Sequence, residues 1–121
     1  MSPIFEEQDQ LDKVEVCLLE GETVIAVYDG GDTGFIGLTD RRVIVQDNAF
    51  DGNRSALTSV PYHRIDAVSF VSDTAVPGEF TFSPSVGISA AGKVYQIRLS
   101  HQDKARHVHE VVLQNMGGPV G

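Results

Sequence analysis

Residues 80–99, FTFSPSVGISAAGKVYQIRL, carry the clearest strand pattern in the chain. Apolar side chains follow every second position from Phe80 and Phe82 onward, with small or polar residues between them, which is the period of a strand that buries one face. Pro84 cannot donate a ladder hydrogen bond, so we expect the strand to be broken, bulged or at a sheet edge there. Gly92 turns the chain, and the alternation then resumes. Two antiparallel strands are therefore predicted here.

Shorter runs of the same kind precede this segment, separated by turn-forming residues. The chain between 48 and 55 is polar and rich in turn residues, and we expect an exposed loop there. Seven strands are predicted, at residues 23–28, 35–38, 43–46, 57–60, 68–71, 80–90 and 95–99.

A helix is predicted on each side of this β-rich region. Asp9 is the expected N-cap of an acidic helix over about residues 9–19, which Gly21 follows. Ser100 and Asp103 resemble a capping box for a closing amphipathic helix. The predicted fold is mainly β with this C-terminal helix: an antiparallel seven-stranded barrel or roll capped by the helix, with the short N-terminal helix added, in a single domain over residues 1–121.

The charge of the chain is strongly negative, and it is unevenly distributed. The 121 residues have a formal net charge of -8. Residues 1–40 contain ten acids and only Lys13, a balance of -9, whereas the remainder has a balance of +1. Because nucleic-acid binding needs a basic face, we expect no nucleic-acid partner.

The N-terminal sequence and the cysteine content favour the cytoplasm. No apolar stretch approaches the roughly 20 residues of a membrane-spanning helix, so we expect no stable membrane insertion. The first residues are acidic where a secretory signal is basic and apolar, and the single Cys17 cannot form an intramolecular disulfide. A cytoplasmic location is therefore predicted.

Three stretches resemble the bacterial pleckstrin-homology-like (PH-like) domains. Residues 18–25 are similar to the entry into the first strand of that family, and residues 37–45, GLTDRRVIV, resemble its turn into an aliphatic strand. Residues 59–65, SVPYHRI, are similar to its proline and tyrosine corner. With the final helix, the resemblance covers about residues 18–114. It implies a PH-like fold and a role in oligomer formation and interaction rather than chemistry.

Eukaryotic PH domains that bind phosphoinositides use basic residues in the loop between their first two strands. The corresponding loop here, residues 29–34, contains Asp29 and Asp32 and no cation. An anionic headgroup would be repelled, so no phosphoinositide is expected. Calcium is a weaker alternative for this loop, because a hairpin turn explains the same Asp and Gly residues.

Neither a metal centre nor a catalytic site is predicted. His107 and His109 are two residues apart on the predicted helix and point in different directions, so they are interpreted as solvated rather than as zinc ligands. Cys17 lies in the predicted N-terminal helix, and no nucleophile elbow accompanies it. We therefore expect no cofactor and no enzymatic activity.

The candidate interaction surface combines four cations with two aromatic residues. Arg41, Arg42, Arg54 and Arg64 are expected in loops that could converge, and this basic region could contact the acidic first helix of a neighbouring subunit. Phe80 and Phe82 are either barrel core or an edge that packs on a partner. The leading hypothesis is a self-associating module, forming a ring and binding protein partners. The alternative is small-ligand or lipid-headgroup binding at the mouth of the barrel.

Overall fold

The computed structural model describes residues 2–51, 54–71 and 84–116. Within these residues the first sheet has the order β1-β2-β3-β4-β5 and the second has the order β6-β7-β8. The strands of the first sheet are β1 (Ile4–Phe5), β2 (Val24–Asp29), β3 (Gly34–Thr39), β4 (Arg42–Asp51) and β5 (Arg54–Pro61). Those of the second are β6 (Ala67–Val71), β7 (Ser85–Ala90) and β8 (Lys93–Arg98).

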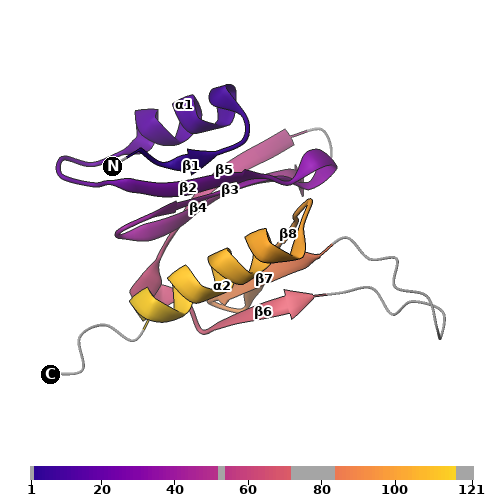
Figure 1. The fold of residues 1–121 in the computed structure, drawn as a ribbon. Helices are drawn as coiled ribbons and strands as arrows, with labels where there is room; N and C mark the ends of the chain where they lie inside the picture. Colours follow the sequence, from indigo (N-terminus) through magenta and orange to yellow (C-terminus); the bar gives the residue numbers. More distant parts are fainter. Residues whose placement is uncertain (1, 52–53, 72–83, 117–121) are drawn as a thin grey trace, which may run out of the picture.

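The molecule is built in layers (Figure 1). Helix α1 (Gln8–Cys17) covers the outer face of the first sheet, and helix α2 (Gln102–Met116) lies beside the second sheet and closes one side of the space between the sheets. The predicted seven antiparallel strands and capping helix are confirmed as a PH-like roll, with β1 as a short additional strand parallel to β2. The two sheets do not close into a barrel.

Two apolar cores follow from this layering. The larger one lies between the sheets and α2, and the smaller one lies under α1, where Leu11 and Val14 pack on Val27, Phe35 and Ile44. Strand β3 separates the two cores, which is why all six of its residues are buried. Successive strand residues point to opposite faces, so both faces of β3 are covered.

The glycines of this region have steric roles. A Cβ at Gly37 would lie 2.8 Å from Cγ2 of Val14, so glycine allows α1 to pack closely on β3. At the start of β3, Gly34 has a φ of 125°, and a Cβ there would overlap the backbone of β4. The predicted turn chemistry of residues 29–34 is confirmed, with a short 3-10 turn at Gly31–Thr33.

Three local predictions were wrong. Residues 48–51 and 54–55, expected in a loop, belong to β4 and β5, because backbone pairing of two strands needs no apolar alternation. Helix α1 begins after Glu7, without the expected cap from Asp9. At α2 the ring Nδ1 of His101, rather than Ser100, accepts a hydrogen bond from the backbone N–H of Asp103 at 3.1 Å.

The segment that carries the strongest strand pattern is only partly described. Strand β7 begins directly after Pro84, as expected for an interruption there, and its residues Val86 and Ile88 are fully buried. Phe80 and Phe82 lie outside the described residues.

Candidate interaction surface

A buried polar network organises the turn between β3 and β4. The Oγ1 of Thr39 accepts hydrogen bonds from the backbone N–H groups of Arg41 (3.1 Å) and Arg42 (3.0 Å) and donates one to Oε2 of Glu22 (2.7 Å). The carboxylate of Asp40 accepts from the backbone N–H of Thr23 at 3.0 Å. The Thr39 bonds hold the turn itself, and the Asp40 bond attaches the turn to the residue before β2.

Arg42 lies at the centre of that network. Its Nη2 and Nε donate to the two carboxylate oxygens of Glu22 at 2.8 and 2.9 Å, a bidentate pair. Its remaining donors reach Oγ of Ser59 (2.8 Å) and the backbone oxygen of Cys17 at the end of α1 (2.5 Å). Arg42 therefore joins α1, β4 and β5. Most of its N–H donors are used within the molecule, so few remain for an outside partner.

The Glu22 side chain is completely buried, so its ionisation affects the free energy of unfolding. The hydrogen bond from Arg42 lowers its pKa from 4.5 to about 2, against the opposing effect of burial. The same hydrogen bond raises the pKa of Arg42. Sequence reasoning did not identify Glu22, because an acid that pairs 20 residues along the chain leaves no local pattern.

Tyr62 also belongs to this network. Its hydroxyl donates to the backbone oxygen of Thr39 at 2.6 Å, and burial of the ring raises the pKa of the phenol. The backbone N–H of Tyr62 in turn donates to the carbonyl of Arg41 at 3.3 Å. These two bonds attach Tyr62 to the turn between β3 and β4.

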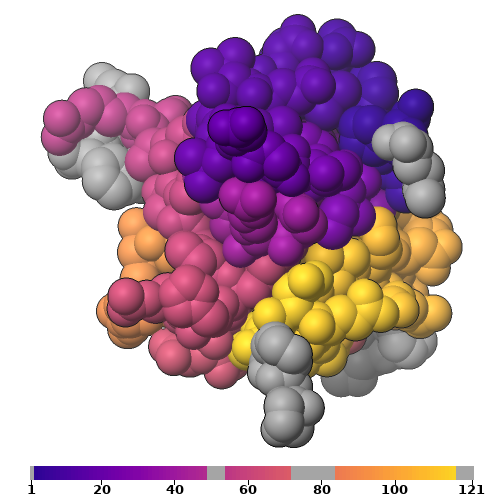
Figure 2. All heavy atoms as spheres, turned by 90° about the vertical axis from the view of Figure 1, so that its left-hand side faces the viewer, coloured from indigo at the N-terminus to yellow at the C-terminus, as the bar shows by residue number. Residues whose placement is uncertain are grey.

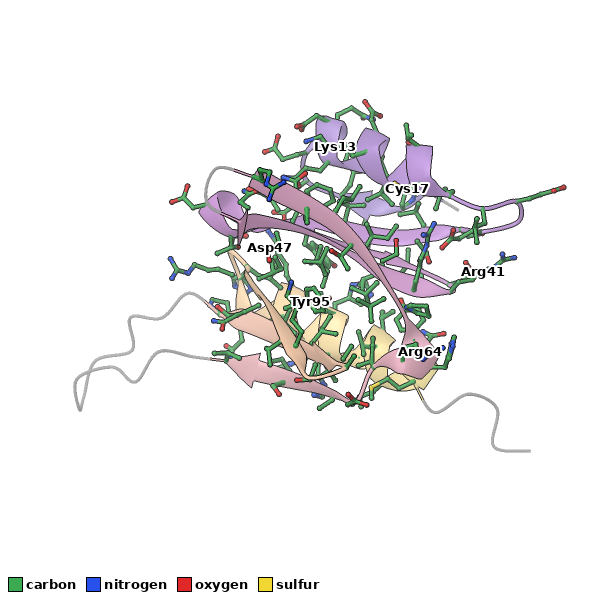
Figure 3. The ribbon with its side chains drawn as sticks, turned by 180° about the vertical axis from the view of Figure 1, so that it is seen from behind. Lys13, Cys17, Arg41, Asp47, Arg64 and Tyr95 are labelled. Carbon is green, nitrogen blue, oxygen red and sulfur yellow. The ribbon has the colours of Figure 1, made fainter. Side chains whose placement is uncertain are left out.

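The other predicted cations are divided between the two ends of β5. Arg41 and Arg64 are exposed near the same end of the molecule (Figure 3), Arg41 in the turn before β4 and Arg64 in the 3-10 turn Tyr62–Arg64. Arg54 begins β5, at the opposite end of that strand from Pro61. The structure thus places Arg41, Arg42 and Arg64 at one end of the molecule and Arg54 at the other end of β5.

A groove opens between the free side of β5 and the free side of β8, opposite α2. Within the described residues β5 pairs only with β4, and β8 pairs only with β7. The groove has a volume of about 490 Å³, and Tyr95 lies in it (Figure 3). Its lining consists of Thr58, Ser59, Val60, Pro61, His63, Arg64, Asp66, Ala90, Ala91 and Tyr95.

Charged groups stand at the edge of this groove. Arg64 lines it, and Nζ of Lys93 lies 4.8 Å from the ring centre of Tyr95. The carboxylate of Asp66 accepts a hydrogen bond from the backbone N–H of Ala91 at 3.3 Å. The groove combines apolar surface, backbone of an edge strand, one cation (Arg64) and one acid (Asp66), and Lys93 lies beside it at Tyr95. Sequence reasoning missed Lys93 and Tyr95, because only the tertiary fold brings β8 opposite β5.

The outer face of α1 has the opposite charge. Asp12 and Glu15 are exposed there, together with Val16 and Leu19, whose exposed fractions are 86% and 59%. Asp12, Glu15 and Val16 belong to α1, and Leu19 follows two residues after the helix ends at Cys17. Figure 2 shows the N-terminal part of the chain, in indigo and purple, gathered on one half of the molecule. The acidity seen in the sequence is therefore a surface property of that half.

The two histidines of α2 contact other side chains, although they were predicted to be solvated. His107 Nδ1 lies 2.6 Å from the hydroxyl of Tyr28, and His109 stacks on Phe70 with ring centres 4.4 Å apart. Both are half-buried rather than solvated. Among the residues that the structure describes, no three His, Cys, Asp or Glu side chains gather as metal ligands.

In the loop after β2, Asp29 Oδ1 accepts a hydrogen bond from the backbone N–H of Gly31 at 3.2 Å, as a turn requires.

Comparison with known proteins identifies the family. The model of the family described as "Bacterial PH domain" matches residues 12–113, and the chain belongs to this family. No curated protein matches the chain. Its resemblance to bacterial PH-like domains is confirmed by both the family match and the solved structures.

Three solved bacterial structures share the fold. A pleckstrin homology domain from Shewanella amazonensis SB2B has a TM-score of 0.65 at 15% identity, over 93% of this chain and 100% of its own. A DUF1696 family protein with a pleckstrin-homology domain from Shewanella loihica PV-4 has a TM-score of 0.64 at 17% identity, over 92% and 94%. A PH-domain-containing protein from Exiguobacterium sibiricum 255-15 has a TM-score of 0.61 at 17% identity, over 93% and 61%.

No helix among the described residues combines the length and apolar character needed to cross a membrane.

Proposed function

We propose that this chain is a non-catalytic bacterial PH module that self-associates head to tail and uses the same surfaces to bind protein partners. The observation that carries the proposal is the placement of unlike surfaces on different parts of one molecule. Helix α1 presents acidic and apolar side chains, and the groove between β5 and β8 presents cations and apolar side chains.

The two surfaces are complementary in chemistry. Asp12 and Glu15 on α1 would face Arg64 and Lys93, and the exposed Val16 would pack on the apolar lining of the groove. Opposite charges of this kind guide orientation and the rate of encounter more than they add affinity. Burial of apolar area supplies the affinity.

A contact of this kind can build a ring. The surfaces differ, so the contact is heterologous, and repeated heterologous contacts form a ring when the rotation between subunits closes. A non-catalytic role is compatible with membership of the bacterial PH domain family.

The test is the subunit number of the purified protein, measured by light scattering and native mass spectrometry at tens of micromolar. We expect an oligomer at low salt whose rate of assembly falls as the salt concentration rises, because exposed charge pairs are screened. Glu15→Lys should reduce association. Glu110→Lys is the matched control, because it makes the same charge change on an exposed position of α2. A monomer at low salt contradicts the proposal.

The groove also supports a second function, the binding of a small ligand or lipid headgroup. Its volume of about 490 Å³ falls in the range of small-molecule sites, and Arg64, His63 and Tyr95 supply polar groups. Native mass spectrometry distinguishes the two functions, since a retained ligand adds its own mass to each subunit. Loss of that mass in Arg64→Ala would favour the ligand.

A further inference from the structure

Strand β1 is a minimal addition to the edge of the first sheet. It consists of Ile4 and Phe5, which pair in parallel with Ala26 and Val27 of β2. Ile4 is 55% exposed and Phe5 is 42% exposed, so this segment buries little apolar area. Its position protects part of an edge that would otherwise be open to another strand.

The carboxylate of Glu6 provides the polar attachment of this segment. Its Oε1 accepts a hydrogen bond from the backbone N–H of Asp29 at 2.9 Å, at the end of β2. Its Oε2 forms an ion pair with Nζ of Lys104, in the first turn of α2. The Glu6 side chain thus attaches the N-terminal segment to both β2 and α2.

The site is larger than the segment that occupies it. An apolar cavity of about 300 Å³ lies beside β1, lined by Ile4, Val24, Ile25 and His107 together with Ser2 and Thr23. The Tyr28 hydroxyl, 2.6 Å from Nδ1, orients the His107 ring. The edge of β2, this cavity and Lys104 form a groove that we call the β2–α2 groove. It suits an extended segment of two apolar residues followed by an acid.

We propose that the β2–α2 groove is an acceptor site for the N-terminal segment of a second copy of this chain, which exchanges with residues 2–6 of the same molecule. The chain itself shows that Ile4-Phe5-Glu6 fits the groove, and a second copy supplies the same three residues. Because the contacts are identical, the closed and exchanged forms differ mainly in the effective concentration of the segment and in hinge strain.

The local structure provides a hinge. Glu7 is extended, with φ -121° and ψ 123°, and makes no side-chain cap on α1. Rotation there would redirect residues 2–6 while α1 keeps its contacts with the first sheet. This exchange does not use the head-to-tail contact between α1 and the β5–β8 groove, so the two can succeed or fail separately.

A charge exchange between two variants tests the proposal. Glu6→Lys places like charges opposite Lys104, and Lys104→Glu places like charges opposite Glu6. In a reciprocally exchanged pair of the two variants, both sites regain opposite charges. Both variants carry Glu15→Lys, so that the head-to-tail contact is weakened in every sample.

We expect the mixture to form a one-to-one mixed dimer about tenfold more abundant than either variant's own dimer, measured by native mass spectrometry. The double variant Glu6→Lys with Lys104→Glu should behave as the Glu15→Lys parent. A mixture without enrichment of mixed dimers would overturn the exchange, whatever the wild-type chain does.

A labelled peptide of residues 1–8 provides a second measurement. It should bind the Lys104 groove of the Glu6→Lys variant, and a peptide with Glu6 replaced by Lys should bind at least tenfold more weakly. Equal binding of the two peptides, or none of either, would contradict the proposed groove.

Discussion

Replacement of Glu22 by glutamine probes the buried ion pair with Arg42. Glutamine keeps the size of the side chain but removes its charge, and Arg42 then lacks its anionic partner. The folded pKa of about 2, against 4.5 for an ordinary glutamate, corresponds to about 3 kcal/mol of folding free energy at neutral pH. Because the folded pKa is lowered, this contribution is complete above about pH 5 and is lost as the pH falls towards 2.

Urea denaturation of the wild-type chain and Glu22→Gln over a range of pH measures this contribution. The wild-type chain should be the more stable at pH 7, and its advantage should shrink by about 2 kcal/mol between pH 7 and pH 3. Glu20→Gln is the control, because Glu20 is exposed beside the same turn and should show no comparable change. An advantage that stays constant with pH would refute the role of the Glu22 charge.

Further substitutions address the packing of the turn and of α1. Gly37→Ala should destabilise the fold by about 1–3 kcal/mol and increase hydrogen exchange in α1, because its Cβ would lie 2.8 Å from Val14. Gly87→Ala, whose Cβ meets its nearest side chain at 3.4 Å, should be nearly neutral in the same urea titration, and equal losses would contradict the close-packing argument. Tyr62→Phe should cost about 1 kcal/mol by leaving the Thr39 carbonyl without its hydroxyl donor, and an unchanged urea midpoint would show that this bond is not stabilising.

Much of the fold could be predicted because strand and helix periods are local. The alternation that begins at Phe80 continues into β7 with Val86 and Ile88 in the core, and Val108 and Val112 form the buried side of α2. The predictions failed where tertiary pairing replaced a local signal. Strand β4 continues to Asp51, which pairs with Arg54 of β5, and His101 caps α2 where Ser100 had been expected.

The candidate surface was less predictable than the fold. Arg41 and Arg42 are neighbours with the same chemistry in the sequence, yet Arg41 is exposed and Arg42 binds Glu22. Arg41 lies in the turn before β4, whereas Arg42 begins the strand and reaches Glu22 and the backbone oxygen of Cys17, two partners that are distant in the sequence. Tyr95 and Arg64 line the same groove because β8 lies opposite β5 in the fold.

The sequence by itself determined the strand and helix content, the PH-like order of elements and the concentration of acid in the first 40 residues, because these depend on neighbouring residues and composition. The tertiary structure alone decided which charges are neutralised inside the fold, which sheet edges remain open, and that Glu6 meets Lys104, 98 positions away. These outcomes depend on contacts between segments that are far apart in the sequence, and a local sequence pattern does not show which distant residues come into contact.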